Sequence, residues 1–151
     1  MSELSISSEI QSYAQAAVHW AKERFETKLD FSEESLKEVE IILDRLHKLL
    51  PQNAWGKLLK HSTYQREIVE MSLVWGSYVG EVIRQNQGGK WNVAMKSRDK
   101  SEILLQIQGI SLFPMEKVSK RLTNGSGDDL WFYYQSFKQM QEQNLTHQKA
   151  A

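Results

Sequence analysis

The apolar residues of the first 87 positions recur every three or four residues, a spacing typical of amphipathic helices. This spacing predicts three helices, over residues 8–28, 32–50 and 62–87. Ser32 is placed to cap the second helix, which ends before Pro51. The Gly88-Gly89 pair ends the third helix in the manner of a glycine C-cap. Residues 51–62 predict a loop with a turn of helix near Trp55.

After residue 89 the apolar period changes from 3.6 to two, which indicates strands. We expect strands at residues 91–95 and 103–107, a short third strand at 110–113, and then two helices at 114–124 and 128–140. Pro114 is placed to begin the first of these helices and Asp128 to cap the second. Helices and strands are therefore segregated along the chain, which predicts an α+β fold. Its helical layer of three N-terminal and two C-terminal helices packs on a small two- or three-stranded antiparallel sheet.

The length of 151 residues and the 40% hydrophobic content fit a single folded domain over residues 1–151, with frayed ends at 1–7 and 142–151. The chain has no cysteine, no apolar run of membrane-spanning length and no signal-peptide pattern at its start. We therefore expect a cytoplasmic protein without disulfides or membrane contacts. The net charge is zero, although the first 50 residues hold ten acidic and six basic side chains.

The third helix carries Gly76 and Gly80, four residues apart, in a strongly helical pattern. Each glycine costs about 1 kcal/mol relative to alanine in a helix interior. Such a cost is typical of a helix whose backbone is approached closely by another element. We expect a helix or strand of the same molecule to pack there.

Glu81 and Arg84 follow on the same helix, three residues apart, and can form a pair on one face. One interpretation is a structural clamp between the helix end and the sheet. The alternative is a binding pocket for a small molecule, lined by Trp75, Tyr78, Glu81, Arg84 and Trp91.

Other combinations of polar residues give weaker indications of chemistry. Glu40, Asp44 and His47 share part of one helix face and resemble half of a carboxylate-bridged metal site, but they flank the apolar seam, so we expect a solvated face. No histidine has a serine and an acid arranged around it, and no phosphate-binding loop is present. We therefore predict no catalytic residue, metal or cofactor. The basic stretch 90–121 suggests nucleic-acid binding, which the zero net charge opposes.

Four consecutive aromatic residues, 131–134, begin the last helix, and such a run points all the way round a helix. At least one of them must face away from the core. Aromatic residues are enriched at interface centres, so Trp131, Phe132 and Tyr134 are the expected interaction surface. The alternative is a second buried contact.

Four segments together resemble a family of small bacterial domains of unknown function. They are Leu29-Asp30-Phe31-Ser32-x-x-Ser35-Leu36, Gly76-x-Tyr78-x-Gly80-Glu81-Val82-x-Arg84, Gly88-Gly89-x-Trp91, and Phe113-Pro114 followed by Lys120-Arg121-Leu122. The resemblance covers residues 29–137 and implies no activity, so no site residue follows from it. Some domains of this size and kind are encoded beside toxins as immunity proteins.

These observations favour a non-enzymatic protein-interaction module that binds a protein partner or forms a homodimer. Two alternatives remain open: a small-molecule-binding protein or weak enzyme with its pocket at Glu81 and Arg84, and a toxin-immunity protein that binds through its charged surface.

Overall fold

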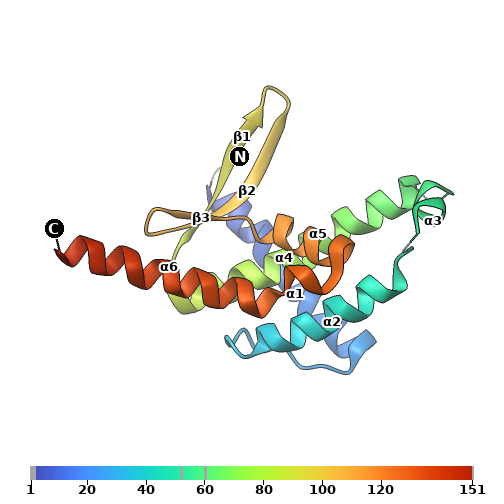
Figure 1. Ribbon diagram of the computed structural model, residues 1–151, viewed down its shortest axis with the longest axis horizontal. Coiled ribbons are helices and arrows are strands. Elements are labelled where there is room, and N and C mark those ends of the chain that lie inside the picture. Colours follow the sequence, from blue (N-terminus) through green and yellow to red (C-terminus); the bar gives the residue numbers. More distant parts are fainter. Residues whose placement is uncertain (1–2, 52, 60, 151) are drawn as a thin grey trace.

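The computed structural model describes residues 3–51, 53–59 and 61–150, which form six α-helices, a short 3-10 helix and one antiparallel sheet (Figure 1). The helices are α1 (Glu3–Phe25), α2 (Ser35–Leu49), α3 (Ala54–Leu59), α4 (His61–Gln87), α5 (Pro114–Asn124) and α6 (Leu130–Ala150), and the 3-10 helix is η1 (Gly125–Asp128). The strands are β1 (Lys90–Ser97), β2 (Lys100–Ile107) and β3 (Ile110–Leu112). This arrangement confirms the predicted α+β fold.

The terminal helices are longer than the apolar pattern predicts. Helix α1 already begins at Glu3, and α6 continues to Ala150, although we expected both ends to be frayed. At the start of α1, Ile6 is buried, so this turn packs on the body of the molecule. Residues 142–147 are exposed and mostly polar, and in Figure 1 this end of α6 extends beyond the other elements. This end is rich in glutamine, which has a high intrinsic helix propensity that apolar periodicity does not report. None of the described helices is both long and apolar enough to cross a membrane.

Helix α4 is the centre of the fold. It packs against α1 and α5 and contacts β2 (Figure 1). All ten residues from Val74 to Ile83 are buried. A helix segment that is buried all round must be covered on several faces at once, and α4 is therefore the element on which the others are positioned.

The sheet has the order β1-β2-β3, and its first two strands form a hairpin that projects from the helices (Figure 1). Trp91 pairs with Leu105 at the base of the hairpin, and both side chains are buried. Val93 pairs with Ile103 further out, and Met95, on the same face, is 68% exposed. The apolar face of the hairpin therefore passes from the core at its base to solvent at its tip.

The two glycines of α4 are required by close packing, as the sequence predicts. A Cβ on Gly76 would lie 2.7 Å from the Met115 Cα at the start of α5. A Cβ on Gly80 would overlap the ring of Trp91 and lie 3.2 Å from the Pro114 Cγ. Gly76 thus allows the backbone of α5 to approach α4, and Gly80 allows the side chain of Trp91 from β1 to do so.

We expect Gly80→Ala to destabilise the protein by about 2 kcal/mol, since overpacking against the buried Trp91 ring outweighs the roughly 1 kcal/mol gained in helix propensity. Urea unfolding followed by circular dichroism measures this change. Gly127→Ala is the control, because a Cβ on Gly127 meets nothing within 4 Å. A neutral or stabilising Gly80→Ala would contradict the close packing.

Candidate functional site

Glu81 is a buried carboxylate with three hydrogen-bond donors around it. Arg84 donates from Nε to Oε2 and from Nη2 to Oε1, at 2.5 and 3.2 Å, and the Trp91 indole N–H donates to Oε2 at 3.1 Å. The hydrogen bond to Glu81 raises the pKa of Arg84 above its ordinary value, against the opposing effect of burial. Both carboxylate oxygens are therefore engaged, Oε1 by Arg84 of the same helix and Oε2 by Arg84 and by Trp91 of β1.

The Arg84 side chain is 29% exposed and borders a polar hollow of about 510 Å³ between α1 and α4. The hollow is lined by Glu81, Arg84, Gln85 and Phe31 together with α1 residues, among them Ser8, Gln11, Ser12 and Gln15. Two of the five residues of the predicted pocket, Glu81 and Arg84, therefore meet at a hollow.

The other three predicted pocket residues do not line this hollow. Trp75 packs edge-on against Trp20 and Phe25 in the core. The Trp91 ring lies against Gly80, so only its indole N–H reaches Glu81. Trp75 precedes Glu81 by six residues on α4, which turns its side chain about 240° around the helix axis and away from that of Glu81. Trp91 belongs to β1 and not to α4.

Tyr78 binds the loop before α2. Its hydroxyl accepts the Phe31 N–H at 3.0 Å and lies 2.7 Å from the Ser35 Oγ. Phe31 has a φ of 61°, a strained conformation for an aromatic residue, and the tyrosine holds it there. Burial raises the pKa of Tyr78. Tyr78 therefore joins α4 to this loop and does not line the hollow.

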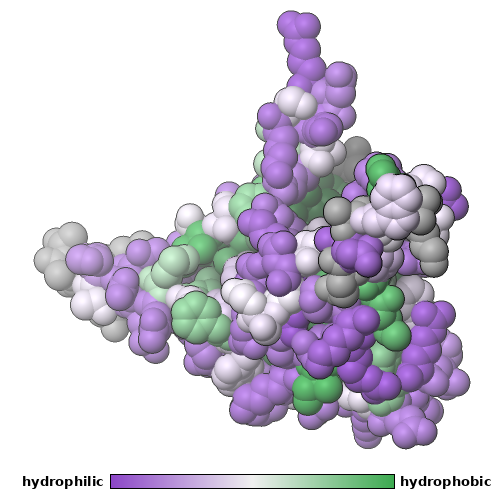
Figure 2. All heavy atoms as spheres, turned by 45° about the vertical axis from the view of Figure 1, so that its right-hand side comes forward, coloured by the Kyte–Doolittle hydropathy of each residue, from purple (hydrophilic) through white to green (hydrophobic). Residues whose placement is uncertain are grey.

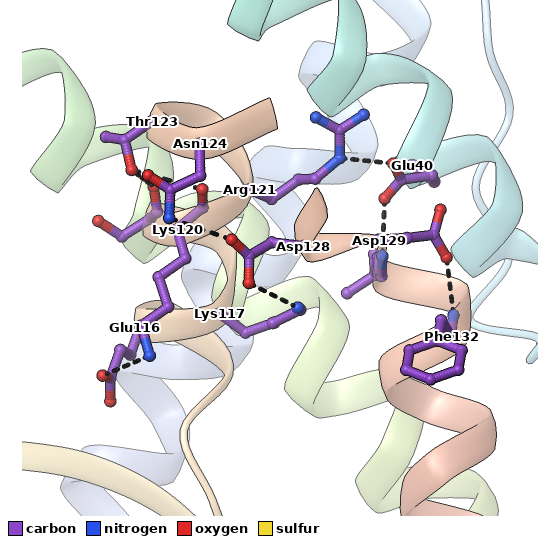
Figure 3. A network of polar contacts seen from close by, with 12 residues as sticks. Glu40, Glu116, Lys117, Lys120, Arg121, Thr123, Asn124, Asp128, Asp129 and Phe132 are labelled. Carbon is purple, nitrogen blue, oxygen red and sulfur yellow. Dashed lines mark hydrogen bonds and ion pairs between the residues drawn. The ribbon is translucent and has the colours of Figure 1, made fainter. Parts of the chain in front are cut away.

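A second buried ionic group joins α2, α5 and α6 (Figure 3). Arg121 is buried and donates to Glu40 and, at 3.0 Å, to Asp44, and the second oxygen of Glu40 accepts the Leu130 N–H at 2.9 Å. His47 Nδ1 lies 2.5 Å from the Leu122 carbonyl oxygen. The expectation of a solvated face for Glu40, Asp44 and His47 is therefore wrong, because α5 covers it.

The cap of α6 is also one residue later than predicted. Asp129 Oδ1 accepts the Phe132 N–H at 2.7 Å, whereas Asp128 accepts from Lys117 and Asn124 (Figure 3). The 3-10 turn from Gly125 to Asp128 shifts the start of the helix by this one position.

The aromatic run at the start of α6 is only partly a surface. Phe132 is 73% exposed, whereas Trp131 is half-buried with the Lys37 ammonium 4.5 Å from its ring centre. Tyr134 is fully buried, so its inclusion in the interaction surface is wrong. It stacks on Phe137 in the core. Of these three residues, Phe132 is therefore the one that is largely exposed.

A further set of exposed apolar side chains lies on the segment at the right of Figure 1 that runs from the end of α2 through α3 into α4. We name it the apolar tip; it comprises Leu49, Trp55, Leu58 and Val69, each between 58% and 79% exposed. Figure 2, which turns this end forward, shows hydrophobic atoms between the hydrophilic ones on that side. Sequence reasoning missed this surface. The available signal was that Leu49 falls outside the seam of its helix and that Trp55 and Leu58 fall in a predicted loop.

Glu33 forms a third polar group that joins the loop before α2 to α4 and α6. Its carboxylate accepts from Gln87 at 3.0 Å and from Lys138 at 3.2 Å. The pKa of Glu33 is lowered, chiefly by its hydrogen bond with Tyr134. Burial acts in the opposite direction, and Lys138 lowers the pKa further. Burial and the neighbouring Glu33 raise the pKa of Tyr134.

We expect Glu33→Gln to reduce the loss of stability in acid. A carboxyl with a lowered folded pKa stabilises the protein above its ordinary pKa of 4.5, and this contribution is lost as the pH falls through the folded value. Urea unfolding at a series of pH values between neutral and acid measures the slope. Glu34→Gln, which changes the neighbouring exposed carboxylate, is the control; equal slopes for both variants would contradict the prediction.

Comparison with known proteins shows a shared fold. No protein-family model matches the chain, and no curated protein matches it. A solved crystal structure of a protein from Bacteroides thetaiotaomicron superposes with a TM-score of 0.58 over 85% of this chain, at 16% sequence identity. The match spans 42% of the length of that protein, so the chain is similar to less than half of it. At this identity the likeness extends to the fold alone.

Proposed function

We propose that the protein is a non-enzymatic interaction module that self-associates through the apolar tip. The observation that carries this proposal is the exposure of four large apolar side chains on three successive helices. Large apolar side chains left in solvent beside polar residues are typical of protein contact sites. Trp55 adds the residue type that most often dominates binding energy.

The charges around the apolar tip favour a second copy of the chain as the partner. A hollow of about 320 Å³ beside Leu49 is bordered by Arg24 on one side and by Glu67 and Glu70 on the other. A two-fold symmetric contact places the same surface on both subunits. A rim with both signs of charge can then pair with itself, and the zero net charge of the chain adds no overall repulsion.

The polar residues that could have supported chemistry act instead between elements of the fold. Glu81 joins α4 to β1, Glu40 joins α2 to α5 and α6, and His47 contacts the α5 carbonyl of Leu122. Groups held in this way have little freedom to exchange protons with a substrate. This use of the acidic and histidine side chains supports a role in binding.

We expect the wild-type protein to show a doubled mass by native mass spectrometry and Trp55→Ser to raise the dimer dissociation constant by about tenfold or more. Sedimentation at several concentrations gives the constants. Phe132→Ser is the matched control, because it removes an equally exposed aromatic residue at another site. A monomeric wild type, or equal weakening by both substitutions, would contradict self-association through the apolar tip.

A second candidate function is the binding of a small polar molecule in the hollow at Glu81 and Arg84. The observation that favours it is the half-buried guanidinium beside a row of hydroxyl and amide side chains on α1. Such groups converge where polar ligands are recognised. The buried Glu81 would then serve to orient Arg84.

Native mass spectrometry of the freshly purified protein also tests this second function. A small bound mass is expected in the wild type and should be lost in Ser12→Phe, which fills the hollow from an exposed position of α1. Glu23→Phe, also exposed on α1 but outside the hollow, should retain the bound mass. A wild type without any added mass, or an added mass that persists in Ser12→Phe, would count against ligand binding there.

A further inference from the structure

An apolar groove of about 410 Å³ lies between α1, α4 and the hairpin, separate from the surfaces described so far. It is formed chiefly by apolar side chains from five elements, namely Ile6, Tyr13, Leu73, Val93, Ile103 and Met115. Its size falls within the range of about 300–1,000 Å³ found for small-molecule sites. Beyond Trp91 the hairpin projects away from the helices. The apolar face of the hairpin and the start of α1 therefore diverge, and the groove lies between them.

A buried hydroxyl at this groove is left without a partner. Ser77 lines the groove from α4, its side chain is fully buried, and its Oγ has no hydrogen-bond partner among the described residues. A buried polar atom without a partner costs free energy. A ligand atom that donates to or accepts from this hydroxyl would remove that cost.

Among the described residues that line the groove, one is charged, namely Glu9 on α1, whose side chain is exposed. The other polar members, Asn92 and Ser101 on the hairpin, are uncharged. A carboxylate beside an apolar site repels anions and attracts cations. The groove is therefore unsuited to fatty-acid-like anions.

From this geometry we propose that the groove binds a small, largely apolar molecule with a hydrogen-bonding group that is uncharged or cationic, such as an aliphatic amine. The apolar walls take the hydrocarbon part, Ser77 offers the internal hydrogen bond and Glu9 attracts the ammonium group. Binding would fill the space between the hairpin and α1. This proposal does not depend on self-association, because the groove and the apolar tip share no residue.

The test uses N-phenyl-1-naphthylamine, an uncharged apolar dye whose fluorescence rises in apolar sites, with the full-length protein. We expect saturable binding to the wild type. Val93→Glu, which places a carboxylate in the groove, should weaken binding by about tenfold or more. Met95→Glu is the matched control, with the same charge change on the same strand face but outside the groove, and should leave the affinity within about twofold. Trp55→Ser should also leave it unchanged.

Displacement of the dye by decylamine, decanol and decanoate, below their micellar concentrations, tests the ligand class. The amine should bind most tightly and decanoate least, and Glu9→Gln should reduce the preference for amine over decanoate by about threefold. Absence of dye binding, equal loss in Val93→Glu and Met95→Glu, or tightest binding of decanoate would each overturn the proposal. If Trp55→Ser lost dye binding while Val93→Glu kept it, the dye would bind at the apolar tip, and this result would also overturn the proposal.

Discussion

The close contact between the Trp91 ring and the backbone of α4 at Gly80 is the constraint on which the rest of the structure depends. Without a Cβ at this position the indole can lie directly on the helix, and its N–H then reaches Glu81, the next residue along α4. Arg84 pairs its positive charge with the negative charge of the same carboxylate. The glycine, the acid and the arginine of α4 therefore form one unit that fixes the base of the hairpin against the central helix. Helix α5 follows from this, because Pro114 and Met115 continue from β3 onto the same glycine-bearing face.

Buried and half-buried polar groups then connect the remaining elements to this centre. Tyr78 holds the loop at Phe31, Glu33 joins that loop to α6, and Arg121 joins α5 to α2. Such groups add little net stability when fully paired, because desolvation offsets much of their attraction. Their effect is on geometry, since a misplaced neighbour would leave a buried charge or hydroxyl without its partner. They select one arrangement of the helices from the several that apolar packing alone would allow.

The sequence predicts what depends on local period and fails where a distant element decides. The spacing of apolar residues predicts the second helix and the hairpin, and Gly76 and Gly80 indicate close packing on their helix. Spacing also places Glu40 and Asp44 beside the seam of α2, but nothing in α2 shows that Arg121 will cover that side. The same limit applies to Trp75, which is aromatic and adjacent to the glycines yet faces Trp20 and Phe25 on α1. Spacing thus brings Glu81 and Arg84 together on α4, but it does not show where the side chains of Trp75, Tyr78 and Trp91 pack.

The two proposed binding surfaces share one helix, because both draw on the first half of α4. Val69 of the apolar tip is exposed, and Leu73, one helical turn further along, lines the groove with Tyr13 of α1. The same helix then enters the core, where every residue from Val74 to Ile83 is packed. A close-packed segment of this kind fixes the position of the turns that precede it. The two surfaces are therefore presented by one rigid helix but use different residues, so a partner at Trp55 and an apolar molecule at Val93 contact separate side chains.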